Sequence, residues 1–263
     1  MHIPPASNQL SPAASPQTER SFLRTAITLA AISIVVSAAV MAGWILNIRE
    51  LTSISPLWTG MKVNSAIAFL LLAAAVVIAG SSSGNKKLVR LFATIVFAIA
   101  ALTIFQDLSG NDLGIDELFF TDNTSIGTIH PGRMSPFTAI NFMVLAACLW
   151  MTISRQRRYR WLSQLCCLLV LLISMFNFDG YIFGVDALYR NFEINQMAVL
   201  TASLFMMLAA SIAFINPGEG IVSVFTRKTR ASKVALRQLM FITVLILLAG
   251  VLIFNGEKAG YYT

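Results

Sequence analysis

Charge is scarce in this 263-residue chain. Only 12% of its residues are Asp, Glu, Lys or Arg, and 57% are hydrophobic. An ordinary soluble domain carries about 25% charged residues. The few charges are gathered into short stretches, which leaves several runs of roughly 20 apolar residues, the length that crosses a bilayer as a helix. The sequence therefore predicts a polytopic α-helical membrane protein, with the lipid bilayer as its first partner.

Residues suited to catalysis are equally scarce. The chain has two histidines, His2 and His130, and its three cysteines lie in apolar runs without a metal-binding spacing. There is no Ser/His/Asp set, no Gly-rich phosphate loop, and no charge in the middle of a predicted span. We predict no enzyme activity in this segment, no cofactor and no bound metal. His130, which lies near several acidic residues, is the weak candidate for a metal ligand.

The apolar runs predict an all-α transmembrane bundle of about seven spans within residues 22–263. A Pro- and Ser-rich stretch, 1–21, precedes them and is expected to be a disordered cytoplasmic tail. Three pseudo-repeated helical hairpins and one further helix make up the bundle. The predicted spans are 22–46, 61–79, 88–105, 134–153, 161–178, 197–215 and 238–255.

The basic residues predict the orientation of the bundle. On these spans, 14 of the 19 Lys and Arg residues fall on one side and 10 of the 12 acids on the other. By the positive-inside rule the basic side, with the N-terminus, is cytoplasmic. The net charge of +7 is therefore explained by topology, and we predict no nucleic-acid partner. The basic side holds Arg20, Arg24, Lys86, Lys87, Arg90, Arg155, Arg157, Arg158, Arg160, Arg227, Lys228, Arg230, Lys233 and Arg237.

A motif recurs at the start of three even-numbered spans. Copies beginning at Met61, Met134 and Met197 all read Met-x3-[Ser/Thr]-Ala-x2-Phe-x2-Leu-Ala-Ala. Three copies in register indicate a repeated supersecondary unit. The connections that precede the second and third copies share Gly-[Ile/Val]-Asp-x-Leu-aromatic, which makes Gly114, Asp116, Gly184 and Asp186 an outer-loop motif.

Two interpretations of the Met motif stand side by side. Alanines seven residues apart, with Ser or Thr hydroxyls, suit helices that pack closely through one face. Alternatively, the three motif turns converge at the outer leaflet and frame a ligand pocket. The residues of that hypothetical pocket are Met61, Asn64, Ser65, Met134, Thr138, Asn141, Met197 and Thr201. The polar intramembrane residues Asn141, Gln164, Ser174 and Thr243 are expected to hydrogen-bond between helices.

Several of these stretches carry a family resemblance. Met134-Ser-Pro-Phe-Thr-Ala139, preceded by Leu113-Gly-Ile-Asp-Glu-Leu-Phe-Phe120 and Pro131-Gly-Arg133, resembles the multi-span N-terminal sensor region of bacterial membrane histidine kinases and diguanylate cyclases. The run Gly256-Glu-Lys-Ala-Gly-Tyr-Tyr262 fits the same family. Asn64 matches an Asn of the family pattern, whereas Phe137 replaces it in the second copy and Leu200 stands at a position that is usually polar.

The resemblance implies a sensory input module in the bacterial inner membrane. Such a module would detect a small-molecule or membrane cue from the periplasm or the outer leaflet. It would signal as a homodimer, through an eighth span, to a kinase or cyclase domain beyond this chain. A small transporter or channel is the alternative function, and a membrane enzyme or metal or haem protein using His130 is a third.

Overall fold

The computed structural model describes residues 16–55, 58–81, 84–122, 130–182 and 197–226, together with 234, 237 and 238. This part of the chain forms helices and connecting loops without a β-strand, so the predicted all-α class is confirmed. The helices are α1 (Pro16–Leu46), α2 (Arg49–Thr52), α3 (Val63–Gly80), α4 (Lys86–Ser109), α5 (Pro136–Thr152), α6 (Arg157–Ile182), α8 (Val199–Phe214) and α9 (Val222–Thr226). The predicted seventh span, 238–255, and most of the tail lie outside the described residues.

Four of the described helices are long and apolar enough to cross a membrane: α1, α3, α4 and α6. The helices α5 and α8 are also apolar but have only 17 and 16 residues. Helices α5 and α8 begin two residues after the starts of the predicted spans 134–153 and 197–215, so Met134 and Met197 precede the helices. At α5 the boundary has a clear cause, since the Ser135 side chain caps the helix and Pro136 occupies its first turn.

The start of α1 differs from the prediction in the opposite direction. This helix begins at Pro16, so residues 16–21 are helical although they were assigned to the disordered tail. Proline suits a first helical position because its φ angle is already fixed near the helical value. It lacks an N–H group, and an N–H group at that position would have no partner within the helix. The basic residues Arg20 and Arg24 are therefore carried on the first turns of α1 and are exposed.

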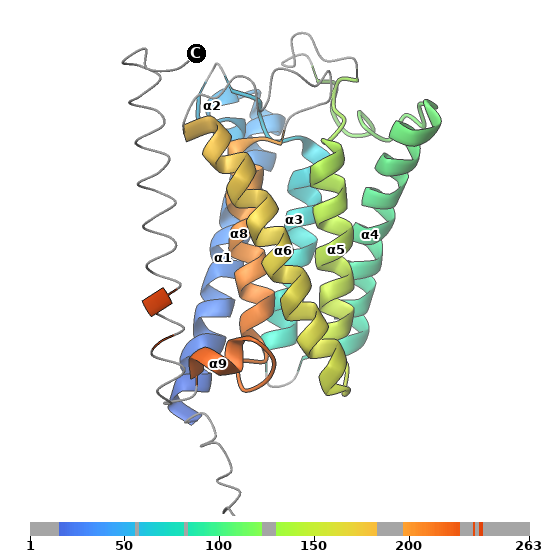
Figure 1. The fold of residues 1–263 in the computed structure, drawn as a ribbon. Helices are drawn as coiled ribbons and strands as arrows, with labels where there is room; N and C mark the ends of the chain where they lie inside the picture. The colour runs from blue at the N-terminus through green and yellow to red at the C-terminus, as the bar shows by residue number, and fades with distance from the viewer. Residues whose placement is uncertain are drawn as a thin grey trace, which may run out of the picture.

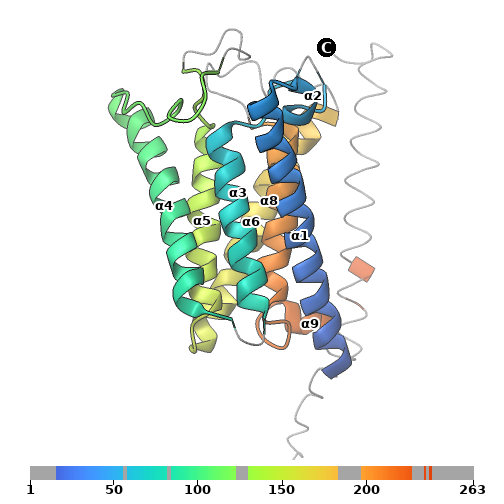
Figure 2. The same cartoon turned by 180° about the vertical axis from the view of Figure 1, so that it is seen from behind.

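The six long helices form one closed ring of neighbours. Along it, α1 packs against α3, α3 against α4, α4 against α5, α5 against α6, α6 against α8, and α8 against α1. The three helices that carry the Met motif, α3, α5 and α8, also contact one another. Figures 1 and 2 show α1 and α4 at opposite edges, α2 at one end of the bundle and α9 at the other. We call these the α2 end and the α9 end.

A ring of three phenylalanines joins the motif helices near their middles. Phe69, Phe142 and Phe205, one from each copy of the motif, are fully buried. Their ring centroids lie 4.6, 4.7 and 4.6 Å apart, and each pair is tilted by about 60°. Aromatic pairs at this spacing contribute about 0.5–1.5 kcal/mol each beyond the area that they bury. The spacing that the three copies of the motif share thus brings equivalent side chains together in the middle of the bundle.

Small residues of the motif let these helices approach. The alanines Ala66, Ala139 and Ala202 have no exposed surface, and the same holds for a second set of motif alanines. Side chains of this size allow close backbone contact between membrane helices. Outward-facing residues are instead large and apolar, as Leu91, Leu102 and others on α4 show, which is what a helix in contact with lipid requires.

Three of the polar residues that were expected to bond between helices, Asn141, Gln164 and Ser174, do so. Asn141 on α5 donates to Ser174 on α6 over 3.4 Å. Gln164 on α6 donates from Nε2 to the carbonyl oxygens of Ala213, Asn216 and Glu219 and accepts from the Val222 N–H. Thr243 lies outside the described residues.

Candidate functional site: a charged clamp at the α2 end

The eight residues of the hypothetical motif pocket are all buried. The three methionines belong to one hydrophobic core, and the polar members mostly bond locally. Thr138 shares a 2.8 Å hydrogen bond with its own capping residue, Ser135, and Asn64 accepts from the Ser65 N–H. None of the eight lines the three pockets described below. Among the described residues these side chains therefore act in packing and capping, and the ligand pocket stays a prediction.

At the α2 end, several acidic side chains surround a buried arginine. The Arg133 side chain is only 3% exposed, and its Nε donates to Oδ2 of Asp116 over 2.7 Å. Its Nη1 donates to Oδ1 of Asp107 over 3.2 Å, and Asp112 lies 3.8 Å from Nη2. Asp116, chosen from the sequence as part of the outer-loop motif, is therefore one half of a buried ion pair. Its counterparts Gly184 and Asp186 lie outside the described residues.

Gln106 supports this pair from the end of α4. Its Nε2 donates to the same Asp116 oxygen over 2.8 Å, while its Oε1 accepts from the Leu113 N–H over 2.9 Å. Burial lowers the pKa of Arg133, but hydrogen bonds and charge attraction from Asp116 and then Asp107 raise it by more, so its pKa lies above the ordinary value. The guanidinium consequently stays charged. The carboxylates of Asp116 and Asp107 bond to it, and the amide of Gln106 bonds to Asp116.

A second buried ion pair fastens the same loop to α3. Lys62, which directly precedes α3, donates from Nζ to Oδ2 of Asp122. The same oxygen accepts from the Gly132 N–H over 3.1 Å, and Oε1 of Glu117 accepts from the Asp122 N–H over 2.7 Å. We call Lys62, Gln106, Asp107, Asp116, Asp122 and Arg133 the charged clamp. It ties the connection between α4 and α5 to the starts of α3 and α5 and the end of α4.

Gly132 allows the two ion pairs to lie side by side. Its φ angle is +73°, and a Cβ atom there would lie 2.7 Å from the carbonyl oxygen of Asp116. No side chain fits so close to backbone. The Pro131-Gly132 breaker between two apolar runs is therefore the turn that places Arg133 against Asp116.

A polar pocket of about 150 Å³ lies beside the clamp. Asp112, Asp116, Glu117, His130 and Arg133 line it. The Oδ1 atom of Asp116 is buried and accepts no hydrogen bond from the residues that the structure describes, so among them the clamp has one spare acceptor. His130 does not join a metal-binding group, because the described residues contain no set of three His, Cys, Asp or Glu side chains that could hold an ion.

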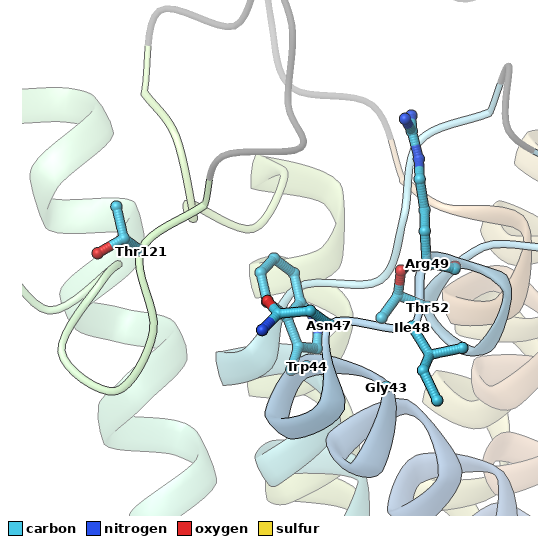
Figure 3. Close-up of a pocket in the computed structure, with 7 residues that line it drawn as sticks. All are labelled: Gly43, Trp44, Asn47, Ile48, Arg49, Thr52 and Thr121. Atoms are coloured by element: carbon cyan, nitrogen blue, oxygen red, sulfur yellow. Dashed lines mark hydrogen bonds between the residues drawn. The ribbon is translucent and has the colours of Figure 1, made fainter.

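A smaller pocket of about 110 Å³ lies between the end of α1, helix α2 and the connection between α4 and α5, which we call the clamp loop. Figure 3 shows its walls, with Trp44 and Asn47 at the end of α1 and Thr121 on the clamp loop across from them. Trp44 donates from its indole nitrogen to the carbonyl oxygen of Met61 over 2.9 Å. The end of α1 is thus bonded to the first residue of a Met motif, one position from Lys62.

The clamp contains acids, cations and an amide, but the described residues do not pair a nucleophile with a base. Its arrangement can hold helices together, and can release them when charge is removed or a competitor binds. No family model, curated protein or solved structure matches this chain. The functional conclusion therefore rests on the residues of the clamp and on the sequence resemblance.

Proposed function

We propose that this chain is the sensory input module of a bacterial signal-transduction protein. It lies in the inner membrane with its N-terminus in the cytoplasm and the α2 end toward the periplasm. A small-molecule or membrane cue reaches the charged clamp, and the signal passes to a cytoplasmic kinase or diguanylate cyclase domain. The observation that carries this proposal is the clamp itself. Its Lys62–Asp122 pair fastens the connection between α4 and α5 to the start of α3, and its Arg133–Asp116 pair closes that connection on itself, beside Gln106 and Asp107 at the end of α4.

The clamp supports a sensing role because its bonds are strong only while they are complete. Removing one partner of a buried ion pair leaves an uncompensated charge, which is costly. A cue that competes for Asp116 or Arg133 would therefore favour an alternative packing of α3, α4 and α5. Such a ligand acts by binding one packing better than the other. The spare acceptor on Asp116 and the adjoining polar pocket offer a place for this competition.

The bundle as a whole would be three repeated hairpins followed by a seventh span at 238–255. The pairs α1 with α3, α4 with α5 and α6 with α8 are the hairpins, and the second helix of each carries the Met motif. The shorter helices α5 and α8 would cross the bilayer together with their flanking apolar residues. A homodimer is the expected assembly, since paired output domains are typical of the family that the sequence resembles.

The rival function, a small transporter or channel, needs a route through the bundle. Phe69, Phe142 and Phe205 fill the place where α3, α5 and α8 meet, and this filling favours the sensor. Flux of ions or small solutes through liposomes that contain the purified protein would decide for the rival.

The proposal is tested with the complete gene product. The downstream reading frame should encode an eighth span and a kinase or cyclase domain, and a different downstream product would contradict the proposal. Output activity is then measured in membrane vesicles for the wild type and for Arg133→Gln. Arg90→Gln, which changes an exposed arginine at the α9 end, is the matched control. We expect Arg133→Gln to shift basal output several-fold while the control leaves it unchanged; equal output in all three contradicts a signalling role for the clamp.

A further inference from the structure

An apolar groove of about 280 Å³ opens between four helices at the α9 end. Its floor is made of Ala209, Ala210 and Ala213 on α8 and Cys167 on α6, and the rings of Phe22 and Phe225 belong to its walls. Protein interiors normally leave few unfilled spaces of this size. Small side chains on the floor keep the groove open, where larger ones would have filled it.

Polar bonds hold the walls of the groove in place. Gln164 sits at its edge and bonds to three carbonyl oxygens and one N–H at the end of α8 and the start of α9. Arg160 donates from Nε and Nη2 to the two carboxylate oxygens of Glu219, over 2.7 and 2.8 Å. On the other side, Phe22 and Phe214 make an edge-to-face contact with centroids 5.0 Å apart. The groove is therefore a fixed feature between α1, α6, α8 and α9.

The groove lies at the strongly basic end of the bundle. The described residues at this end include Arg20, Arg24, Lys86, Lys87, Arg90, Arg155, Arg157, Arg158 and Arg160, against the acids Glu19 and Glu219. Arg157, Gln164 and Leu171 are spaced seven apart on α6 and so lie along one helix face. Gln164 and Leu171 line the groove, and Arg157, two helical turns before Gln164, is exposed at the start of α6.

We infer that this groove binds an anionic phospholipid of the adjoining leaflet. One acyl chain lies over the alanine floor, and the phosphate group lies among the arginines at the start of α6. The groove itself is apolar, and the basic residues lie around it at the same end of the bundle. Clusters of Lys and Arg beside membrane helices attract anionic head groups. The charge of this end selects an anionic lipid over a neutral one. A second copy of the chain is a poorer occupant, because a stable protein interface needs a much wider surface than this groove.

The experiment uses the purified chain in neutral detergent, titrated with phosphatidylglycerol or with phosphatidylcholine of the same acyl chains. Retained lipid is counted by native mass spectrometry, and the rise in Tm gives an apparent Kd. We expect phosphatidylglycerol to be retained and to stabilise the wild type more than phosphatidylcholine does. Ala213→Phe fills the groove and should weaken phosphatidylglycerol binding by about tenfold or more, as expected when contacts of roughly two methylene groups are lost.

Matched variants distinguish lipid binding in the groove from lipid contact elsewhere on the protein surface. Ala98→Phe adds the same bulk at an exposed position of α4 and should leave binding unchanged. Arg157→Gln should reduce the preference for phosphatidylglycerol, whereas Arg90→Gln should retain it. Ala210→Leu is a milder second filling variant, so the test does not depend on one substitution that fails to fold.

Two results would overturn the inference. One is equal retention of both lipids by the wild type. The other is equal phosphatidylglycerol binding by Ala213→Phe, Ala210→Leu and Ala98→Phe. Failure of all three variants to retain lipid, as when another part of the chain covers the groove, counts as equal binding. The readout is binding to the chain itself, so it is independent of whether the protein signals.

Discussion

The two ends of the bundle are held together by different chemistry. At the α2 end, the fastening groups are ions: Arg133 with Asp116 and Lys62 with Asp122, all with little or no exposed side-chain surface. At the α9 end the central fastener is the neutral amide of Gln164, and the one ion pair described there, Arg160 with Glu219, is partly exposed. Several other arginines at this end, such as Arg157 and Arg158, are exposed to solvent. Buried charge concentrates at one end, and surface charge at the other.

This difference bears on how each end responds to its surroundings. A buried ion pair is sensitive to the loss of either partner, because the remaining charge has no water to solvate it. Exposed arginines are solvated and screened by salt, and each contributes little to stability. The α2 end is therefore suited to switching, whereas the α9 end is suited to broad attraction for an anionic surface. The ring of Phe69, Phe142 and Phe205 lies between the two ends and joins α3, α5 and α8.

The largest predicted effect comes from removing the buried cation of the clamp. Arg133→Met should lower the free energy of unfolding by about 3–5 kcal/mol, because Asp116 is left buried without a counter-charge. Chemical or thermal unfolding in detergent micelles measures the loss. The double variant Arg133→Met with Asp116→Leu should recover a large part of it. A double variant that is as unstable as the sum of the two single ones would contradict a direct pairing.

A smaller loss is predicted at the turn that aligns the two ion pairs. Gly132→Ala should destabilise by about 1–3 kcal/mol, because the new methyl group meets the Asp116 carbonyl and the left-handed φ disfavours a side chain. Gly110→Ala is the matched control, since Gly110 also has a positive φ of 68° but has open space around its Cβ direction. Equal losses in the two variants would mean that backbone strain alone, and not the contact with Asp116, limits position 132.

The sequence predicted the helices of this fold better than it predicted the clamp. Apolar runs indicated the helical class, and the repeated Met motif indicated three equivalent helices that pack through one face, since both depend on local spacing. Asp116 was also found, from its place in a recurring loop motif. Lys62 was counted only as a charge on the acidic side of the membrane, and Arg133 was noted beyond its charge only as the last residue of the Pro131-Gly-Arg133 stretch of the family resemblance.

The missed pairings are long-range contacts. Lys62 and Asp122 lie 60 residues apart, and only the packing of α3 beside α4 brings them together. Periodicity does not reveal such a contact. One available signal was the position of each cation, because a Lys or Arg directly beside the first residue of a Met motif, as Lys62 and Arg133 are, needs a partner once the motif is buried. Gln106, by contrast, was visible only as a polar residue at the end of an apolar run.

At the α9 end, a moderate loss of stability is predicted when the neutral amide of Gln164 is replaced. Gln164→Leu should lower the free energy of unfolding by about 1–2 kcal/mol, because the Val222 N–H and the carbonyl oxygens that it bonds lose their partner. Gln164→Glu separates hydrogen bonding from packing, since it keeps the size but loses the donors. If Gln164→Leu were as damaging as Arg133→Met, the contrast between the buried ion pairs of the α2 end and the neutral amide fastener of the α9 end would not hold.

The smallest effect is predicted for an exposed arginine at the same end. Arg158→Gln should change the free energy of unfolding by less than about 0.5 kcal/mol, because the side chain is exposed and bonds only to its neighbours Gln156 and Tyr159. Thermal unfolding at low and high salt measures this, and both values should stay close to those of the wild type. A loss comparable to that of Gln164→Leu would mean that surface charge at the α9 end is structural, and the arginines there would then be as specific in their pairing as Arg133 is in the clamp.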